Sequence, residues 1–249
     1  MQRPDTVQHY LHCDYLDPGE KALYAAILPE AKGKPLLDIG VGGGRTVDAL
    51  TAISADYTAI DYAKEMVQAL ARRRPSLRIL HADARDMSMF QDGSMFLVVF
   101  SCAGIDMVDA ADRLRVLREV LRVLAPGGAF IFSTHNLECR RREREPTLLD
   151  IFLPLQRSSF SRVRNFLALR KLVEKKSDWA ILNSKYHAYS TLMHYITMRA
   201  QRAQLEEVGF APGAVAYSNE GELISGNGSD SFMLHFMARA PVRAGSRGG

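Results

Sequence analysis

A glycine-rich turn between a short apolar run and a helix start constrains this sequence more than any other feature. The run Leu36–Ile39 predicts a buried strand, and three glycines at alternate positions follow it, Gly40, Gly42 and Gly44. Residues without a Cβ let the main chain lie close to a ligand. A helix predicted from Thr46 onward directs its unbonded N–H groups toward the same turn. This strand–turn–helix unit predicts a nucleotide-like ligand at the glycines.

The spacing of these glycines does not match the dinucleotide fingerprint. The pattern G-x-G-x-x-G needs a third glycine three residues after the second. Counted from Gly40 that position is Arg45, and counted from Gly42 it is Val47. The sequence instead has an acid, Asp38, inside the strand that precedes the turn. A carboxylate at this place favours a ligand with positive charge over one with phosphates.

Strand-like and helix-like segments alternate along most of the chain. This alternation predicts an α/β fold with a mostly parallel sheet that helices cover on both faces. Helices are expected at 19–31, 46–50, 65–74, 111–124 and 197–208, and strands at 36–39, 57–60, 77–80, 96–100 and 129–133, with an antiparallel pair at 214–218 and 231–238.

Further candidate ligand residues follow the second and third predicted strands. Asp61 ends the second strand, where an acid can hold the two hydroxyls of a ribose, although it can also cap the next helix. Tyr62 and Met66 can line an adenine face, and core packing explains Met66 equally well. Asp83 can accept a hydrogen bond from the adenine amine while the N–H of Ala84 donates to a ring nitrogen.

The order of these motifs resembles that of the class I S-adenosylmethionine-dependent methyltransferases. The resemblance implies a Rossmann-like, seven-stranded, mostly parallel sheet with a reversed last strand, and S-adenosylmethionine (SAM) as the cofactor. It also places Ser101, at the end of the fourth strand, among the cofactor-binding residues. The segments that carry the resemblance are 38–44, 59–62, 83–84 and 124–128, within matching regions at about 20–135 and 197–238.

A basic segment interrupts the alternation of strands and helices. Residues 140–176 hold eleven Arg or Lys and four Asp or Glu, a net charge of +7, which leaves −3 for the rest of the chain. We expect a SAM-binding core of residues 1–135 and 197–240, an inserted helical cap or substrate region at 136–196, and a disordered tail at 241–249. The basic segment favours an anionic partner, or is an exposed helix face whose long stems cover apolar surface.

Two functions follow from these observations. The preferred one is methylation of a small molecule, such as a sugar or another natural-product intermediate, on oxygen or nitrogen. The alternative is a nucleic-acid methyltransferase or binding module that uses the segment 140–176. Two observations argue against the alternative. Phe152, Phe160 and Phe166 resemble helix core rather than a platform on which bases stack. The strand end 101–104 does not resemble the Asn/Asp-Pro-Pro-Tyr/Phe signature of methyltransferases that act on base amines.

Three side chains are candidate catalytic residues. A hydroxyl acceptor must lose its proton, so a base is expected near the strand ends. His135, directly after the fifth predicted strand, is the first candidate, although it can also be an ordinary polar loop residue. His187 belongs to an aromatic, strand-like run at 185–197 that can cover the acceptor or simply pack. Tyr15 is proposed, on family resemblance, as part of a lid over the methionine end of the cofactor.

The remaining expectations concern location and partners. Three widely spaced cysteines indicate a reducing compartment without disulfides or a metal site. The N-terminus has no apolar signal region, and no apolar run reaches the roughly 18 residues of a membrane span. We therefore expect a cytoplasmic protein without a membrane partner. The sequence leaves the acceptor open, and also the choice between monomer and homodimer.

Overall fold

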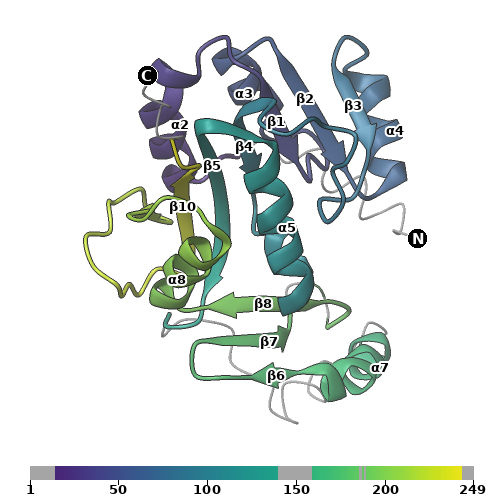
Figure 1. Ribbon diagram of the computed structural model, residues 1–249. Coiled ribbons are helices and arrows are strands. Elements are labelled where there is room, and N and C mark those ends of the chain that lie inside the picture. Colours follow the sequence, from purple (N-terminus) through teal and green to yellow (C-terminus); the bar gives the residue numbers. More distant parts are fainter. Residues whose placement is uncertain (1–14, 140–158, 185–186, 188, 243–249) are drawn as a thin grey trace.

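The computed structural model describes residues 15–139, 159–184, 187 and 189–242, and its centre is a mostly parallel sheet (Figure 1). Seven strands form this core in the order β3-β2-β1-β4-β5-β10-β9. β10 runs antiparallel to β5, so the predicted reversed last strand is confirmed. The core strands are β1 (Leu36–Ile39), β2 (Tyr57–Asp61), β3 (Arg78–His81), β4 (Met95–Phe100), β5 (Leu124–Asn136), β9 (Val215–Ser218) and β10 (Met233–Arg239).

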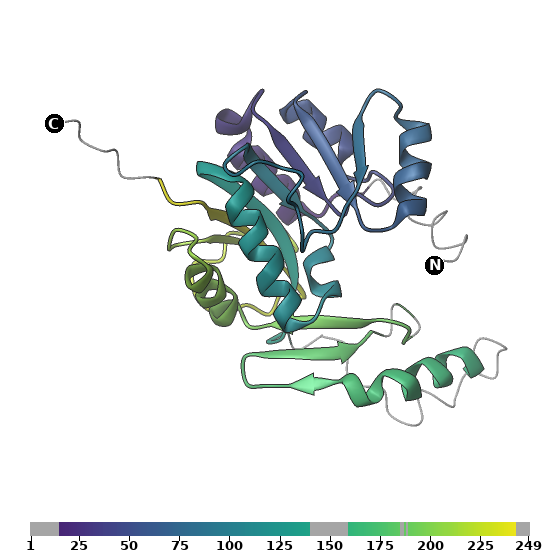
Figure 2. The ribbon, with the colours of Figure 1, turned by 45° about the vertical axis from the view of Figure 1, so that its right-hand side comes forward.

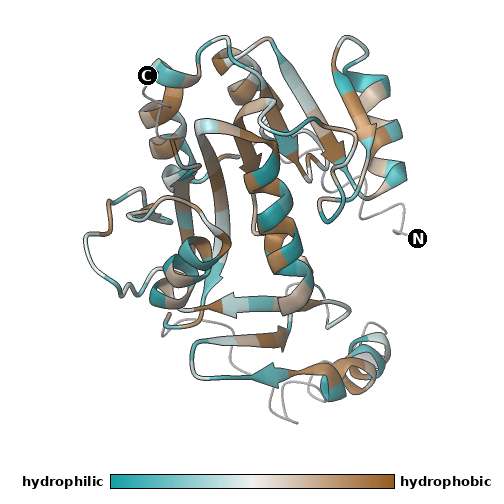
Figure 3. Cartoon of the chain, in the orientation of Figure 1, coloured by the Kyte–Doolittle hydropathy of each residue, from teal (hydrophilic) through white to brown (hydrophobic). Residues whose placement is uncertain are grey.

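Helices pack on both faces of this sheet through two apolar clusters. One cluster joins α5 and α8 to the sheet, and the other joins α2 and α3 to the opposite face. The central strands are accordingly hydrophobic along most of their length (Figure 3). None of the helices in the described ranges is both long and apolar enough to cross a membrane. The helices of the core are α2 (Pro18–Ala31), α3 (Val47–Ile53), α4 (Lys64–Arg73), the short η1 (Gly104–Met107), α5 (Ala110–Val123) and α8 (Met198–Val208).

β5 differs from its prediction at both ends. A turn at 126–128 was expected before a strand from Ala129, whereas the strand runs continuously from Leu124. Met95 pairs with Leu124 but Leu97 pairs with Ala129, so the predicted turn is a bulge within the strand. At the other end the strand continues to Asn136, which places His135 inside β5 rather than after it.

An extension of three further strands is attached to the carboxyl end of β5. Its first strand, β8 (Leu192–Ile196), pairs in parallel with residues 135 and 136, beyond the end of β4. β7 (Trp179–Asn183) and β6 (Glu174–Lys175) then continue antiparallel, and α7 (Ser159–Leu169) and η2 (Arg170–Leu172) precede them. The extension lies on the side of the core toward which β1 and β2 point (Figure 2). These strands were not predicted, apart from the strand-like run that contains β8.

The basic segment is described only from residue 159 onward. Arg164, Arg170 and Lys171 are exposed there. Phe166 packs edge-to-face against Tyr189, with ring centroids 5.8 Å apart. This aromatic side chain therefore packs within the extension. The part of the segment at 140–158 and the tail at 243–249 lie outside the described residues.

A buried ion pair joins four elements of the core. Arg113 of α5 donates to Asp106 of η1 at 2.6 Å, and both side chains are fully buried. Arg113 also donates to Gln201 of α8 at 2.6 Å and to Thr134 of β5 at 3.1 Å. The guanidinium therefore holds η1, α5, β5 and α8 in one arrangement.

The variant Arg113→Leu tests the importance of this pair. It leaves the Asp106 carboxylate buried without its counter-ion, so we expect the free energy of unfolding to fall by about 3–5 kcal/mol. Arg115→Leu is the control, because Arg115 is 69% exposed in its side chain and reaches Asp112 only at 3.4 Å. That variant should lose less than about 1 kcal/mol in the same urea titration. Equal losses in the two variants would contradict the assignment.

His194 of β8 should make the free energy of unfolding depend on pH. Its ring stacks on Trp179 with centroids 5.5 Å apart and is buried, which lowers its pKa from the ordinary value of 6.5 to about 3. The unfolded chain therefore binds a proton that the folded chain does not, and stability falls as the pH drops below 6.5. Between pH 7.5 and 5.0 the wild type should lose about 1–2 kcal/mol more than His194→Phe. Parallel pH profiles of the two proteins would contradict this.

Candidate functional site

Two glycines of the turn after β1 are closely packed, and a third has open space beside it. A Cβ on Gly40 would lie 2.8 Å from the Phe100 ring, and one on Gly44 would lie 2.7 Å from Leu70. Any larger residue at these two positions would therefore clash with the protein's own side chains. A Cβ on Gly42 would meet only the Gly40 carbonyl oxygen, at 3.9 Å. Gly42 is thus the position where the main chain is open to a ligand.

Asp61 lies directly beside this open position. One carboxylate oxygen accepts from the N–H of Gly42 and the other from the N–H of Ala63, each at 2.7 Å. Burial raises the pKa of Asp61, while these two hydrogen bonds lower it. A carboxylate offers about four acceptor positions, so about two remain for a ligand. This geometry fits a ribose diol, and the ribose role stays a prediction.

The predicted adenine residues differ in exposure and in partners. Tyr62 is 70% exposed, and its carbonyl oxygen lies 2.9 Å from His81 Nε2. Met66 is 3% exposed, so it packs inward. Asp83 is held by Arg85, which donates to it through Nε at 3.0 Å and Nη2 at 2.6 Å. Arg85 lowers the pKa of Asp83.

The Arg85 contact was not predicted, and it means that an adenine amine would share the Asp83 carboxylate with a guanidinium. Ala84 follows Asp83 in the same turn, which is closed by a hydrogen bond from Asp86 N to the Asp83 carbonyl at 3.0 Å. The adenine roles of Tyr62, Met66, Asp83 and Ala84 stay predictions.

Asp38 is buried beneath the glycine turn with one unmet hydrogen bond. Its Oδ2 accepts from Thr46 at 2.6 Å and from the Tyr57 hydroxyl at 2.8 Å. Its Oδ1 is buried and has no partner in the described part of the chain. Burial raises the pKa of Asp38 to about 6. A carboxylate in this state is stabilised by any added donor, so the residues present fit a cofactor that carries an ammonium group.

A second ion pair joins the glycine turn to the start of α2. Arg45 donates to the two oxygens of Glu20 at 2.6 and 2.7 Å, and to the carbonyl oxygen of Tyr15 at 2.7 Å. In the sequence, Arg45 was notable only because it breaks the dinucleotide fingerprint. The side chain of Tyr15 is exposed beside this pair, and its predicted role stays untested by these contacts.

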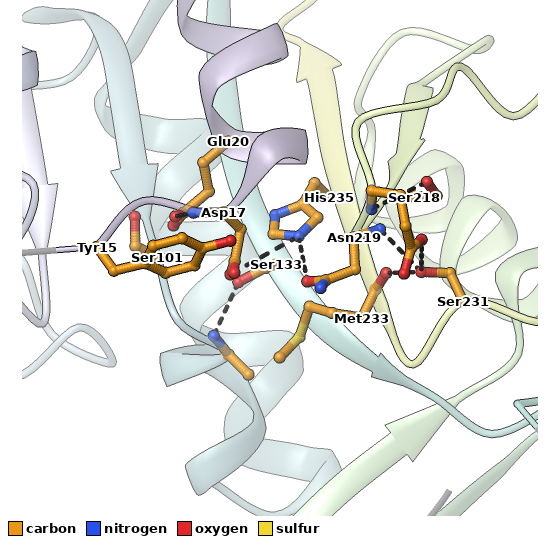
Figure 4. Close-up of polar contacts among 12 residues, drawn as sticks. Tyr15, Asp17, Glu20, Ser101, Ser133, Ser218, Asn219, Ser231, Met233 and His235 are labelled. Atoms are coloured by element: carbon orange, nitrogen blue, oxygen red, sulfur yellow. Dashed lines mark hydrogen bonds and ion pairs between the residues drawn. The ribbon is translucent and has the colours of Figure 1, made fainter. Parts of the chain in front are cut away.

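The end of β4 forms a strained turn over the same region. Cys102 and Ala103 both adopt left-handed backbone conformations, with φ of 53° and 52°. The N–H of Ala103 donates to Ser133 Oγ of β5 at 2.8 Å. Ser101 Oγ lies 3.1 Å from the Tyr24 hydroxyl. Such backbone strain concentrates at functional sites, and Figure 4 shows Ser101 and Ser133 facing the start of α2.

His135 is oriented by a carboxylate that sequence reasoning missed. Asp106 Oδ2 accepts from the main-chain N–H of His135 at 2.7 Å and lies 2.8 Å from Nδ1. Burial raises the pKa of Asp106, but Arg113 and His135 outweigh it and leave the pKa below its usual range. An ionised carboxylate only accepts, so Nδ1 carries a proton, and in the neutral ring Nε2 is the nitrogen with a lone pair. No sequence motif pointed to Asp106, which lies in the short helix η1.

His187, the second catalytic candidate, lies in the connection between β7 and β8. Its Nδ1 lies 3.0 Å from Ser184 Oγ. Within β8, the adjacent residues His194 and Tyr195 point to opposite faces of the sheet. Tyr189 adopts a positive φ of 59° outside the strand, and Tyr186 lies outside the described residues.

Comparison with known proteins identifies the first part of the chain. Residues 37–132 match the family model described as "Methyltransferase domain". A demethylmenaquinone methyltransferase from Clavibacter sepedonicus is 34% identical over 123 residues, which are 47% of this chain and 48% of the relative. A ubiquinone biosynthesis O-methyltransferase from Xanthomonas campestris pv. campestris is 33% identical over 119 residues, 45% and 48% of the two chains. The chain thus spans about half the length of the curated relatives it matches.

Solved structures share the fold over nearly the whole chain. A SAM-dependent methyltransferase from Mesorhizobium loti has a TM-score of 0.59 at 19% identity and covers 89% of this chain and 97% of its own. A glycopeptide N-methyltransferase complexed with S-adenosyl-L-homocysteine has a TM-score of 0.60 at 18% identity and covers 92% of both chains. The family match and the strand order agree: residues 37–132 match a methyltransferase domain, and the described part of the chain has the fold of SAM-dependent methyltransferases.

Proposed function

We propose that this protein transfers a methyl group from SAM to an oxygen or nitrogen atom of a small molecule. The observation that carries the proposal is that a candidate cofactor site and a candidate base lie at the same edge of the sheet. The open glycine turn at Gly42, braced by Asp61, lies at the carboxyl end of β1. The oriented pair of His135 and Asp106 lies at the carboxyl end of β5. The names of the two relatives, both from quinone biosynthesis, support a small acceptor over a nucleic acid.

The chain's residues would bind and orient both reactants. When bound, SAM supplies a methyl group on a sulfonium, which an in-line displacement moves to the acceptor. Gly42 and Asp61 would hold the adenosine part. Alignment of the acceptor and exclusion of water lower the barrier of such a displacement. Tyr195 and Phe232 pack around the His135 ring, with centroids at 4.9 and 5.1 Å, and leave that side chain 11% exposed.

His135 would remove the proton from a hydroxyl acceptor. Its Nε2 accepts this proton while Nδ1–H continues to donate to Asp106. The resulting imidazolium is stabilised by the Asp106 carboxylate, which Arg113 keeps ionised at 2.6 Å. The pair would therefore act as the general base of the proposed transfer.

The variant Asp61→Ala tests the cofactor site. It removes a charged hydrogen-bond acceptor, so affinity for S-adenosylhomocysteine should fall by about 1–3 kcal/mol in isothermal titration calorimetry. Asp48→Ala is the matched control, because Asp48 is an acid of α3 with a side chain 77% exposed. Unchanged affinity in Asp61→Ala would remove the ribose assignment.

The variant His135→Ala tests the base. We expect kcat in an acceptor screen, followed by S-adenosylhomocysteine formation, to fall by about 10²–10⁴-fold. The affinity for S-adenosylhomocysteine should stay within about twofold, because the histidine is expected to touch the acceptor rather than the cofactor. His187→Ala, the other histidine candidate, is the comparison. A normal kcat in His135→Ala, or a loss confined to His187→Ala, would refute the assignment.

A further inference from the structure

A second group of polar side chains lies on the same face of the sheet as His135. We call Asp17, Glu20, Asn219 and His235 the His235 cluster; it lies between the start of α2 and the strands β9 and β10 (Figure 4). His235 pairs in register with Ser133, so both side chains point to the face that the start of α2 covers. Because Met233 pairs with His135, the two histidines are diagonal neighbours on adjacent strands, about 7–8 Å apart.

His235 has a buried nitrogen without a partner. Its side chain is 1% exposed, and its Nε2 lies 3.4 Å from Asn219 Oδ1 and 4.0 Å from Asp17 Oδ2. Both neighbours are oxygen acceptors, so Nε2 carries the ring proton. Nδ1 is then an acceptor, and it has no donor among the described residues. Burial lowers the pKa of His235 to about 4, so the ring is neutral at pH 7.

The two acids of the cluster are not equivalent. Glu20 is neutralised by the two hydrogen bonds from Arg45. Asp17 has no such partner: burial and the neighbouring Glu20 raise its pKa, and its side chain is 22% exposed. The cluster therefore offers acceptors and one uncompensated negative charge. Its chemical complement is a cation that carries N–H donors.

The spacing of three side-chain atoms in the cluster suits a small bound cation. One side-chain atom each from Asp17, Glu20 and His235 lies within 4.8 Å of the other two. An ammonium that donates to three acceptors at about 2.8 Å separates them by about 4.6 Å. A zinc ion bound at about 2.1 Å would bring its ligands to about 3.4 Å from one another. The separation of 4.0 Å between Asp17 Oδ2 and His235 Nε2 lies between these two values, so a metal ion is tested below as the competing occupant.

We propose that Asp17, Glu20 and His235 form a subsite for a primary ammonium group on the methyl acceptor. The proposal rests on the proposed function and narrows its acceptor class. Since the subsite and His135 lie diagonally on one face, the anchored amine is not the atom that reaches His135. The acceptor class is therefore a hydroxyl compound that also carries a primary amine several bonds away.

Benzylamine and benzyl alcohol are suitable probes, because they have nearly the same shape but only the amine is charged. Their binding is measured by saturation-transfer NMR on the full chain loaded with S-adenosylhomocysteine. The wild type should bind benzylamine at least tenfold more tightly than benzyl alcohol. Asp17→Asn should lose this preference while keeping the start of α2, because asparagine serves equally well at a helix N-cap. Asp48→Asn, a surface change on α3, should keep the preference.

Several results would overturn the proposal. Equal affinities for the two probes in the wild type would do so, as would an amine preference that survives in Asp17→Asn. A loss of S-adenosylhomocysteine affinity in Asp17→Asn would assign the subsite to the cofactor's own amino group. Micromolar Mn²⁺ binding that Asp17→Asn abolishes would assign it to a metal. The affinity of the wild type for S-adenosylhomocysteine, measured in the same samples, tests the proposed function separately.

Discussion

Asp106 is a buried carboxylate that receives four hydrogen bonds, from Arg113, Thr134 and both the main chain and the ring of His135. A charge at this depth is tolerated only because every acceptor position has a donor. The same bonds fix the position of η1 after β4 and the orientation of the His135 ring. The arrangement that stabilises the fold and the arrangement proposed to act on the acceptor are thus one network.

The cofactor side is built on a different principle. Main-chain N–H groups of Gly42 and Ala63 position the Asp61 carboxylate, and the Phe100 and Leu70 side chains fill the space that a Cβ would need at Gly40 and Gly44. The pair of Arg45 and Glu20 then fastens this turn to α2. Backbone and packing shape the proposed nucleoside end, whereas charged side chains shape the proposed acceptor end.

The elements that were predictable are those encoded within a few residues. The glycine turn and the acid at the end of β2 follow from local spacing, and each appears at the expected place, whereas the reversed last strand was implied by the family resemblance. The partners that define the site were not predictable. Asp106 and His135 are 29 residues apart, and Glu20 and Arg45 are 25 apart. Nothing in the spacing of such pairs indicates contact, because only the folded sheet brings them together.

Prediction also failed where local patterns compete with tertiary pairing. The sequence Pro126–Gly128 is typical of a turn, yet β4 and β10 on either side hold it within β5 as a bulge. The extension strand β6 consists of two charged residues and β7 of only five residues, so both were too short for periodicity to reveal them. Their existence depends on β8, which finds a free edge of β5 only where β4 has ended.

The attachment of β8 to β5 has a consequence for the proposed acceptor side of the site. Tyr195 is in register with His135, so a shift of the extension is transmitted to the imidazole, whereas the glycine turn on β1 is separated from it by β4. Under the proposed function, changes in β6, β7 and β8 would therefore alter acceptor recognition while leaving the proposed nucleoside site on β1 unchanged.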